Sequence, residues 1–507
     1  MPRLTPGQYP AARHAMGLRP HMVCQAAGGI MKGNWVIGTG SAAILCYGTA
    51  LARTPHMDPS GTEVPHTLQA ALAAAYLTNP VLRQERANLR ATDEQVSQAL
   101  GGWRPTITGT ASMSYYSGVT RMAPTAGESG YARQYDTPGY SGGVSIAQPI
   151  YTGGKTTATT HKARHAVMAE RARLIVAEQL VFTDVVNAYI NVVEDEQILS
   201  IDINNEQVYA AQLRATELRA HGGEITHTDV AQAQGALANA RAVRQLAEGT
   251  LQADRATYRQ VVGTDAPDNL TPPQPLVLPL HTEQETMAMA VQNNPQVVAA
   301  LFDEASKKDA VGVAFAALMP TISAQAAYMH GINQDEGRSL ANNKYAVVSA
   351  SLPLYQGGGE YAAVRMARQQ AAEAAQAVDV QRRTAVQLAA ASWQRMQANR
   401  AAIDSNREAV TADATALHGM QRQAIVGTTT TLAVLQQQET LLQAQIALVR
   451  SAGNLVQSTY QATAAIGRLT AHDLNLDVPL YDERAYYRAV HDRLWGISDY
   501  ATSQPGR

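Results

Sequence analysis

The sequence predicts a mainly α-helical protein with a small membrane β-sheet, built as a twofold internal repeat. Three observations carry this fold class. One stretch of about 67 residues contains no Gly or Pro, Gly and Pro residues elsewhere recur at constant offsets, and four short segments alternate between apolar and polar residues. Together they favour long helical hairpins joined to strands of the length that crosses a bilayer.

The uninterrupted stretch runs from Lys155 to His221. As one helix it would be roughly 100 Å long, far above the average of about three turns. Its apolar positions step by seven, four and three residues, which is a heptad seam that requires partner helices. They are Leu174, Val181, Val185, Ala188, Val192, Leu199 and Ile203. Charged residues interrupt it throughout, so no part reaches the roughly 18 apolar residues of a membrane helix.

Residues 1–52 are predicted to be a leader. Met31 and Lys32 precede an apolar stretch that ends at Tyr47, and Ala50-Leu51-Ala52 is a small-x-small cleavage signal. We expect the mature chain to begin near Arg53 and favour Met31 as the start codon, which would leave residues 1–30 untranslated. An uncleaved membrane anchor is the alternative. Leu45 before Cys46 is too large for a lipoprotein cleavage site.

The composition excludes several classes of protein. Lys and Arg total 40 against 42 Asp and Glu, so no nucleic-acid partner is expected. Cys24 and Cys46 both lie in the leader, which fits export and excludes a disulfide framework. No Gly-rich phosphate loop, nucleophile elbow or paired Cys ligands occur, so we expect no enzyme and no cofactor.

The repeat is marked by residues that interrupt regular structure. Asn79-Pro80 and Pro105 recur 215 residues later, and five Gly residues recur 204 residues later. The Gly positions are Gly153-Gly154 with Gly357-Gly358, Gly223 with Gly427, Gly249 with Gly453, and Gly263 with Gly467. The first repeat therefore covers residues 53–270 and the second 281–470. A Pro-rich linker at 271–280 joins them, and a C-terminal tail at 471–507 has no assigned role.

Each repeat is predicted to contain the same elements in the same order. A helix of about 37 residues comes first, from Pro65 to Gly101 and from Thr282 to Leu318. Two strands follow, at 106–116 and 140–151 in the first repeat and at 321–330 and 345–355 in the second. A helical hairpin closes each repeat, at 155–262 and 360–466. Stacked end to end, the two shorter helices of a repeat would run beside its long helix.

The four strands favour a membrane barrel. Ile107, Ala111 and Tyr115 fall on one face of the first strand, and Thr and Ser residues fall on the other. Each strand has about 11 residues, enough to cross a bilayer when tilted. Four strands do not close a barrel, and lipid does not tolerate open edges, so the chain must oligomerise. The alternative is a half-buried sheet on a soluble domain.

The sequence resembles the TolC family of outer-membrane efflux and secretion ducts. The resemblance covers about residues 63 to 480. It is carried by the order and duplication of several motifs: Ala71-Leu72 with Asn79-Pro80, Trp103-Arg104-Pro105, Gln148-Pro149-Ile150-Tyr151-Thr152-Gly153-Gly154, Leu352-Pro353-Leu354-Tyr355-Gln356-Gly357-Gly358, Gly223 with Thr228-Asp229-Val230-Ala231-Gln232-Ala233-Gln234, and Gly427-Thr428-Thr429-Thr430-Thr431-Leu432-Ala433-Val434-Leu435.

The resemblance implies a homotrimer in the bacterial outer membrane. Three chains would contribute twelve strands to one β-barrel in outer-membrane lipid, and twelve helical columns would form an α-barrel tunnel in the periplasm. The implied partners are an inner-membrane transporter and a periplasmic adaptor (membrane fusion) protein that docks near the hairpin tips. The function would be passive export in efflux or type I secretion.

The resemblance also implies a narrow periplasmic aperture lined by acidic residues. The positions aligned with the family's acidic pair are Ala433 and Gln436, and those aligned with its closing latch are Ala424 and Thr429, so this chain departs from both patterns. Asp229 does match a family position. We therefore expect an entrance that opens more easily and is less sensitive to cations. Gln436, Gln437 and Gln438 either line the same constriction or form a solvated helix surface.

Asp229 has two interpretations. Its place in a first helical turn favours capping, in which a carboxylate accepts hydrogen bonds from free backbone N–H groups. The functional interpretation is a threefold acidic ring at the aperture. Gly223 and Gly427 are assigned to the hairpin turns. Gly153, Gly154, Gly357 and Gly358 are assigned to the bends between strands and helices, for which glycine's backbone freedom is suited.

Two other groups of residues contain side chains of the kind that form a binding site. His161 and His165 have the spacing of a metal pair on a helix, but no third ligand is near in sequence, which favours a solvated face and no metal. The cluster Glu194-Asp195-Glu196 also favours a solvated face, or a charged tunnel wall. A periplasmic adaptor or a cytosolic coiled-coil scaffold are the alternative functions for the chain. Fractionation separates them, because only a duct is a detergent-stable trimer in the outer membrane.

Overall fold

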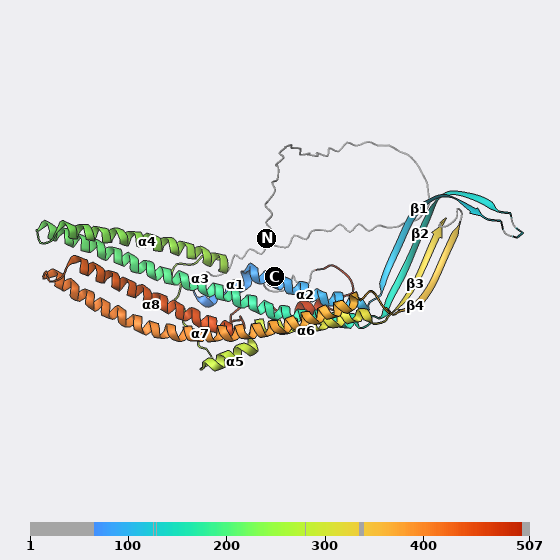
Figure 1. Ribbon diagram of the computed structural model, residues 1–507. Helices are drawn as coiled ribbons and strands as arrows, with labels where there is room; N and C mark the ends of the chain where they lie inside the picture. The colour runs from blue at the N-terminus through green and yellow to red at the C-terminus, as the bar shows by residue number, and fades with distance from the viewer. Residues whose placement is uncertain (1–64, 125, 128, 279, 334–338, 499–507) are drawn as a thin grey trace, which may run out of the picture. The chain divides into compact units, whose positions relative to one another are not determined.

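The computed structural model describes residues 65–124, 126–127, 129–278, 280–333 and 339–498. The predicted leader therefore lies outside the described residues. Within them, the two repeats have the same elements, and their long helices dominate the fold (Figure 1). None of the described helices is both long enough and apolar enough to cross a membrane.

Each repeat begins with two helices instead of the one predicted. α1 (Leu68–Thr78) and α2 (Pro80–Leu100) are separated at Asn79, and α5 (Glu283–Asn293) and α6 (Pro295–Phe315) at Asn294. The single-helix prediction is wrong because proline lacks the N–H of a continuing helix and pushes the preceding residue out of the α region. Asn79 is extended, with ψ 126°, and its side chain caps the amide of Val81 at 2.9 Å.

The two long hairpins confirm the pattern read from the sequence. α3 (Lys155–His221) and α7 (Gly359–Ile425) each have 67 residues. α4 (His227–Val262) and α8 (Thr431–Ala465) fold back beside them. The heptad seam of α3 is buried from Leu174 to Val192, whereas Ile203 is exposed. Packing of this seam against neighbouring helices stabilises α3, because helix propensity alone contributes little to the stability of a helix in water.

Shorter helices stack end to end along the long ones, as expected. The Asn79 side-chain amide donates to the Val261 carbonyl at 2.9 Å, which joins the end of α4 to the start of α2. The Asn294 amide donates to the Ala465 carbonyl at 3.1 Å and joins α8 to α6 in the same way. The Asn-Pro dipeptides of the repeat therefore satisfy carbonyl groups that a helix C-terminus leaves unpaired.

The sheet is antiparallel, in the order β1-β2-β3-β4. Its strands are β1 (Thr106–Met122), β2 (Tyr131–Tyr151), β3 (Thr321–Ile332) and β4 (Leu340–Ser351). β1 and β2 are longer than predicted because they continue as a paired ribbon, with Met122 opposite Tyr131. The predicted end of the fourth strand at residue 355 is wrong: β4 ends at Ser351, before Pro353, because proline has no N–H for the ladder.

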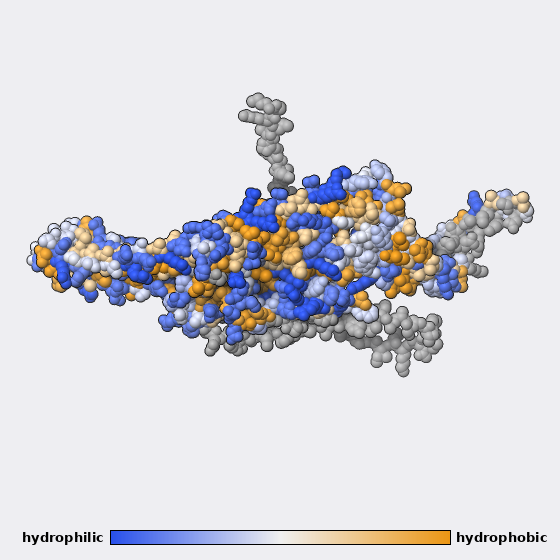
Figure 2. All heavy atoms as spheres, turned by 90° about the horizontal axis from the view of Figure 1, so that it is seen from below, coloured by the Kyte–Doolittle hydropathy of each residue, from blue (hydrophilic) through white to orange (hydrophobic). Residues whose placement is uncertain are grey.

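The sheet does not cover a core. Ile107, Met113 and Tyr115 of β1 are 67, 71 and 67% exposed in the single chain. A half-buried soluble sheet would bury one of its faces, so this alternative is wrong. Figure 2 shows that hydrophobic residues, in orange, also reach the surface of the helical part among hydrophilic ones.

The main core lies around the middle of α3. It centres on Phe182 and Tyr189, and residues from α1, α4, α8 and the C-terminal segment pack on it. The Tyr189 hydroxyl contacts the carbonyls of His66 and Thr271 at 2.9 and 2.8 Å, so it can donate to either of them. The C-terminal tail, to which no role was assigned from the sequence, is thus partly structural and includes α9 (Ala485–Val490).

Candidate functional site

The two hairpin tips have the same backbone geometry. Gly223 and Gly427, predicted at the turns, have φ of +76° and +77°, a region that only glycine adopts readily. Thr226 and Thr430 then cap α4 and α8, and their hydroxyls accept from the amides of Asp229 and Ala433 at 3.3 and 3.2 Å. Residues 229 and 433, both predicted at the aperture, therefore occupy equivalent positions in the first turn of a helix.

Asp229 completes a capping box that the second tip lacks. Its carboxylate accepts from the amide and the hydroxyl of Thr226 at 3.0 and 2.7 Å, and these hydrogen bonds lower the pKa of Asp229. The capping interpretation is confirmed. Ala433 has no such group. The role of Asp229 in an acidic ring stays a prediction, because a ring requires other copies of the chain.

The three glutamines that follow Ala433 have different surroundings. Gln436 is exposed and lines a hollow between the hairpins with Tyr209, Gln232 and Glu439. Gln437 donates to Asp413 within its own hairpin at 3.0 Å, and Gln438 donates to Asn205 of α3 at 3.0 Å. Of the three, Gln436 alone is exposed in the single chain, so it stays a candidate aperture residue.

The hairpins meet through polar groups near Asn205. Besides the Gln438 contact, the Tyr209 hydroxyl donates to the Leu435 carbonyl at 3.5 Å. Asp202 is buried one turn before Asn205 on α3, and its Oδ1 atom has no hydrogen-bond partner. Burial and the nearby Glu439 raise the pKa of Asp202. This polar contact between the hairpins is weaker than an apolar seam would be, because imperfectly paired buried polar groups contribute little net free energy.

The predicted bends between strands and helices are left-handed. Gly153, Gly154, Gly357 and Gly358 have φ of +65°, +85°, +73° and +85°. At Gly153 a Cβ atom would also lie 2.7 Å from the Cβ of Met319 and 2.8 Å from the carbonyl oxygen of Ala316. This bend therefore needs glycine for its backbone angle and for the close approach of the second repeat.

The prediction of a solvated helix face is confirmed for His161, but it is wrong for His165 and for the acidic cluster at 194–196. His165 contacts Asp309 of α6 at 2.6 Å and stacks on Phe302, while His161 stays exposed.

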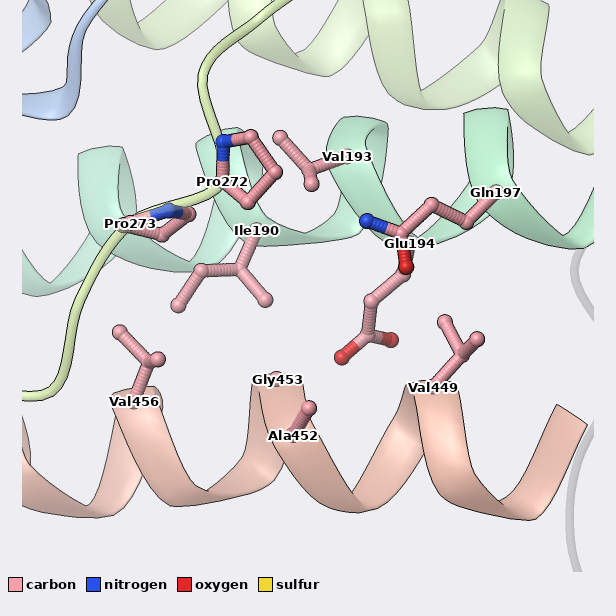
Figure 3. A pocket seen from close by; sticks show the side chains of 10 residues that line it. All are labelled: Ile190, Val193, Glu194, Gln197, Pro272, Pro273, Val449, Ala452, Gly453 and Val456. Carbon is pink, nitrogen blue, oxygen red and sulfur yellow. The ribbon is translucent and has the colours of Figure 1, made fainter. Parts of the chain in front are cut away.

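In the acidic cluster, Glu196 pairs with Arg255 of α4 at 2.9 Å. Glu194 points into a cavity between α3, α8 and the linker, toward Gly453 and across from Pro272 and Pro273 (Figure 3). The signal in the sequence was the pair Gly249 and Gly453, of which the second makes room for this carboxylate.

The pKa values of this acidic cluster are raised. Burial, helped by the charge of Asp195, raises the pKa of Glu194 to about 7, and the charge of Arg450 opposes this effect. Burial and the neighbouring Asp254 raise the pKa of Asp195 to about 6. A carboxylate whose pKa is raised prefers to be protonated in the folded state, so the junction between the hairpins is sensitive to pH near neutrality.

We expect replacement of Glu194 by glutamine to stabilise the protein at pH 8 and to flatten its pH dependence. Above pH 7 the folded state holds a partly buried charge. As the pH falls below about 7, only the folded state takes up a proton, so stability rises until the unfolded carboxyl titrates near 4.5. Thermal unfolding in detergent between pH 8 and 5 measures this. The exposed Glu373→Gln variant should keep the wild-type slope, and an unchanged slope in Glu194→Gln would contradict the prediction.

We expect Asp229→Ala to loosen the first turn of α4, because the Thr226 amide loses its acceptor. Hydrogen exchange at Thr226 should become faster by several fold. Asp229→Asn keeps an oxygen acceptor and should exchange like the wild type. Equal acceleration in both variants would mean that the charge, not the hydrogen bond, holds the turn.

Comparison with known proteins matches both repeats to one family. The family described as "Outer membrane efflux protein" matches residues 71–264 and 287–468. The chain is 32% identical over 462 residues to the outer membrane efflux protein BepC of Brucella suis, covering 90% of this chain and 96% of that protein. It is 24% identical over 434 residues to the outer membrane protein TolC of Escherichia coli, covering 79% and 82%.

Solved structures support the same fold. A membrane protein from Pseudomonas aeruginosa superposes with a TM-score of 0.70 at 18% identity, covering 79% of this chain and 90% of that one. The Campylobacter jejuni CmeC outer membrane channel gives 0.69 at 17% identity, covering 80% and 86%. The two-repeat arrangement of helices and strands is thus shared with outer-membrane channels.

Proposed function

Because the chain belongs to the outer membrane efflux protein family and is an efflux channel of the outer membrane, we propose that three copies assemble into one passive duct. The observation that carries this proposal is the four-stranded sheet, in which β1 and β4 are edge strands. Lipid offers no hydrogen-bond partners for open edges, so β1 of one copy must pair with β4 of the next. Three copies supply twelve strands, a number that closes a barrel.

The helical part supports the same assembly. Large apolar side chains remain exposed along the long helices and their partners in the single chain. They include Leu180, Ile203, Leu218, Leu246, Met366 and Leu388. Contact with neighbouring copies would bury such residues and form the wall of a periplasmic tunnel. A periplasmic adaptor is not favoured, because the chain has two hairpins and a four-stranded sheet instead of one hairpin with soluble β modules.

The duct has no chemistry of its own in this proposal. An inner-membrane transporter supplies the energy, and a periplasmic adaptor docks near the tips at Gly223 and Gly427. Opening separates the hairpins where Gln438 contacts Asn205, a polar contact that can be exchanged for water at little net free energy.

Fractionation of cells that express the chain tests the assembly. We expect the mature protein in the outer membrane, and a particle of three copies in detergent by native mass spectrometry. A water-soluble monomer in the absence of detergent would overturn the proposal.

The proposed aperture predicts weak block by divalent cations. Asp229 supplies one carboxylate per copy, whereas Ala433 and Gln436 supply none. Single-channel conductance in a planar bilayer should show weak block, and Asp229→Asn should remove it because this variant keeps the cap but not the charge. Strong block that persists in Asp229→Asn would contradict this role.

A further inference from the structure

The chain after α9 forms a turn that is fixed next to the sheet. The Arg493 carbonyl accepts from Arg104 Nη1 at 2.8 Å and from the Ser97 hydroxyl at 3.5 Å. Ser97 lies in the last turn of α2, and Arg104 lies two residues before β1 begins at Thr106. The turn at 493–498 is therefore attached where the chain passes from helix to strand.

The turn has a defined shape. The Arg493 side chain folds back over it, with Nε donating to the Trp495 carbonyl at 2.9 Å and Nη1 donating to the Ser498 carbonyl at 3.0 Å. Gly496 has φ of +100°, a conformation that favours glycine. These contacts satisfy backbone carbonyls from within the turn and leave its apolar side chains outside.

Three large apolar side chains of this turn are nearly free of protein contact. Leu494, Trp495 and Ile497 are 75, 88 and 98% exposed. A single exposed apolar residue is ordinary on a protein surface. Three within four residues, on a turn held by specific hydrogen bonds, mark a surface that binds something apolar.

Lipid is the occupant that the surroundings favour. Thr106 pairs with Ala147 and Thr321 with Ser351, so the start of β1 and the end of β4 lie at the same, helix-facing end of the sheet. Exposed apolar residues gather at this end, including Trp103, Ile107, Tyr151, Leu352, Leu354 and Tyr355. Aromatic girdles at strand ends are typical of the membrane–water interface of outer-membrane barrels. The turn is therefore continuous with the surface that faces the bilayer.

We propose that Leu494, Trp495 and Ile497 insert into the periplasmic leaflet of the outer membrane and anchor the C-terminal segment there. The indole of Trp495 suits the boundary between headgroups and acyl chains, since one end of it is apolar and the other can hydrogen-bond. Arg104 and Arg493 contact the backbone of the same turn, and cations so near the bilayer can attract lipid phosphates. The anchor rests on the outer-membrane location of the chain and not on the number of copies in the duct.

Quenching of tryptophan fluorescence by brominated lipid tests the anchor. The chain has four Trp residues, Trp35, Trp103, Trp393 and Trp495. A full-length channel with Trp35, Trp103 and Trp393 replaced by Phe retains Trp495 alone, and is reconstituted into phosphatidylcholine vesicles with or without bromine on the acyl chains. We expect about a twofold loss of Trp495 emission, as for an interfacial indole.

A matched control retains Trp393 alone. Trp393 lies on α7, 34 residues after Gly359, or roughly 50 Å along the helix. It packs against the cluster around Met396. Brominated lipid should leave its emission unchanged. The comparison separates contact with lipid from general effects of the vesicles on fluorescence.

Two results would overturn the proposal. Trp495 quenched by aqueous iodide but not by brominated lipid would lie in water. Trp495 protected from both would be covered by another copy of the chain. If the Phe substitutions prevent folding, Ile497→Cys with a nitroxide label gives the same answer from its accessibility to oxygen against a water-soluble relaxant, because no cysteine remains after the predicted leader.

Discussion

Gly467→Ala is expected to destabilise the channel more than an alanine at any other glycine of the hairpin ends. Gly467 follows α8 with φ of +81°, and a Cβ there would collide with the carbonyl oxygen of Asn293 and lie 2.9 Å from its carbon. A left-handed alanine costs about 1–2 kcal/mol by itself. The collision is with backbone, which has no rotamer by which to move away, so α8 must shift away from the junction of α5 and α6.

Two other glycines separate these two effects. Gly427 has φ of +77° and no atom within 4 Å of the added Cβ, so Gly427→Ala should show the backbone strain alone. At Gly263, the repeat equivalent of Gly467, an added Cβ would meet only the side chain of Thr78, whose hydroxyl lies 3.1 Å away, and a side chain can yield. Thermal midpoints of the purified channel in detergent should therefore fall least for Gly427→Ala and most for Gly467→Ala. Equal shifts in all three variants would show that the close approach to Asn293 is unimportant.

The repeat could be predicted from the sequence because particular residue types are needed where its helices end. Only residues such as Gly263 and Gly467, or the Asn-Pro pairs, satisfy the backbone at the points where helices end, so they recur at fixed offsets. For the same reason, the prediction of a long helix from Lys155 to His221 was correct at both ends. The extension of β1 and β2 was not visible, because Gly, Pro and Asp residues in it are typical of loops.

The candidate site could be predicted only in part. The turns at Gly223 and Gly427 and the cap at Asp229 are local, so the sequence contains them. The burial of Glu194 depends on Gly453, which lies 259 positions later in the chain. The periodicity of apolar residues does not predict contacts between residues so far apart in the sequence. Whether Asp229, Ala433 and Gln436 form an aperture depends on neighbouring copies.

Arg86→Met is expected to destabilise the channel and release its C-terminal segment. Arg86 of α2 is 1% exposed, and its guanidinium lies 4.6 Å from the ring of Tyr76 and 5.2 Å from that of Tyr481. Its Nη2 atom donates to the Tyr76 carbonyl at 3.1 Å. The Tyr76 hydroxyl in turn accepts from the Tyr481 amide at 3.1 Å. This one cation therefore connects α1 and α2 to the segment that follows α8.

Glu178 of α3 makes the loss of Arg86 larger. Its carboxylate accepts from the Ala471 amide at 2.5 Å, burial raises its pKa to about 7, and the charge of Arg86 opposes that rise. Without Arg86 the ionised carboxylate loses the positive charge that opposes this rise, so its charged form becomes less favourable in the folded state. The pKa of Glu178 should rise further, so the loss of stability should be greater at pH 8 than at pH 6, where protonation relieves the folded state.

Limited trypsin digestion and thermal unfolding at the two pH values measure both effects. In Arg86→Met, cleavage at Arg484 and Arg488 should become faster, because the segment spends more time detached. The double variant Arg86→Met with Glu178→Gln is the control. Its amide oxygen still accepts from Ala471 but carries no charge, so much of the lost stability and the protease resistance should return. If the double variant is as unstable as Arg86→Met, the stacking of Arg86 between Tyr76 and Tyr481 holds the segment, and the buried charge of Glu178 does not matter.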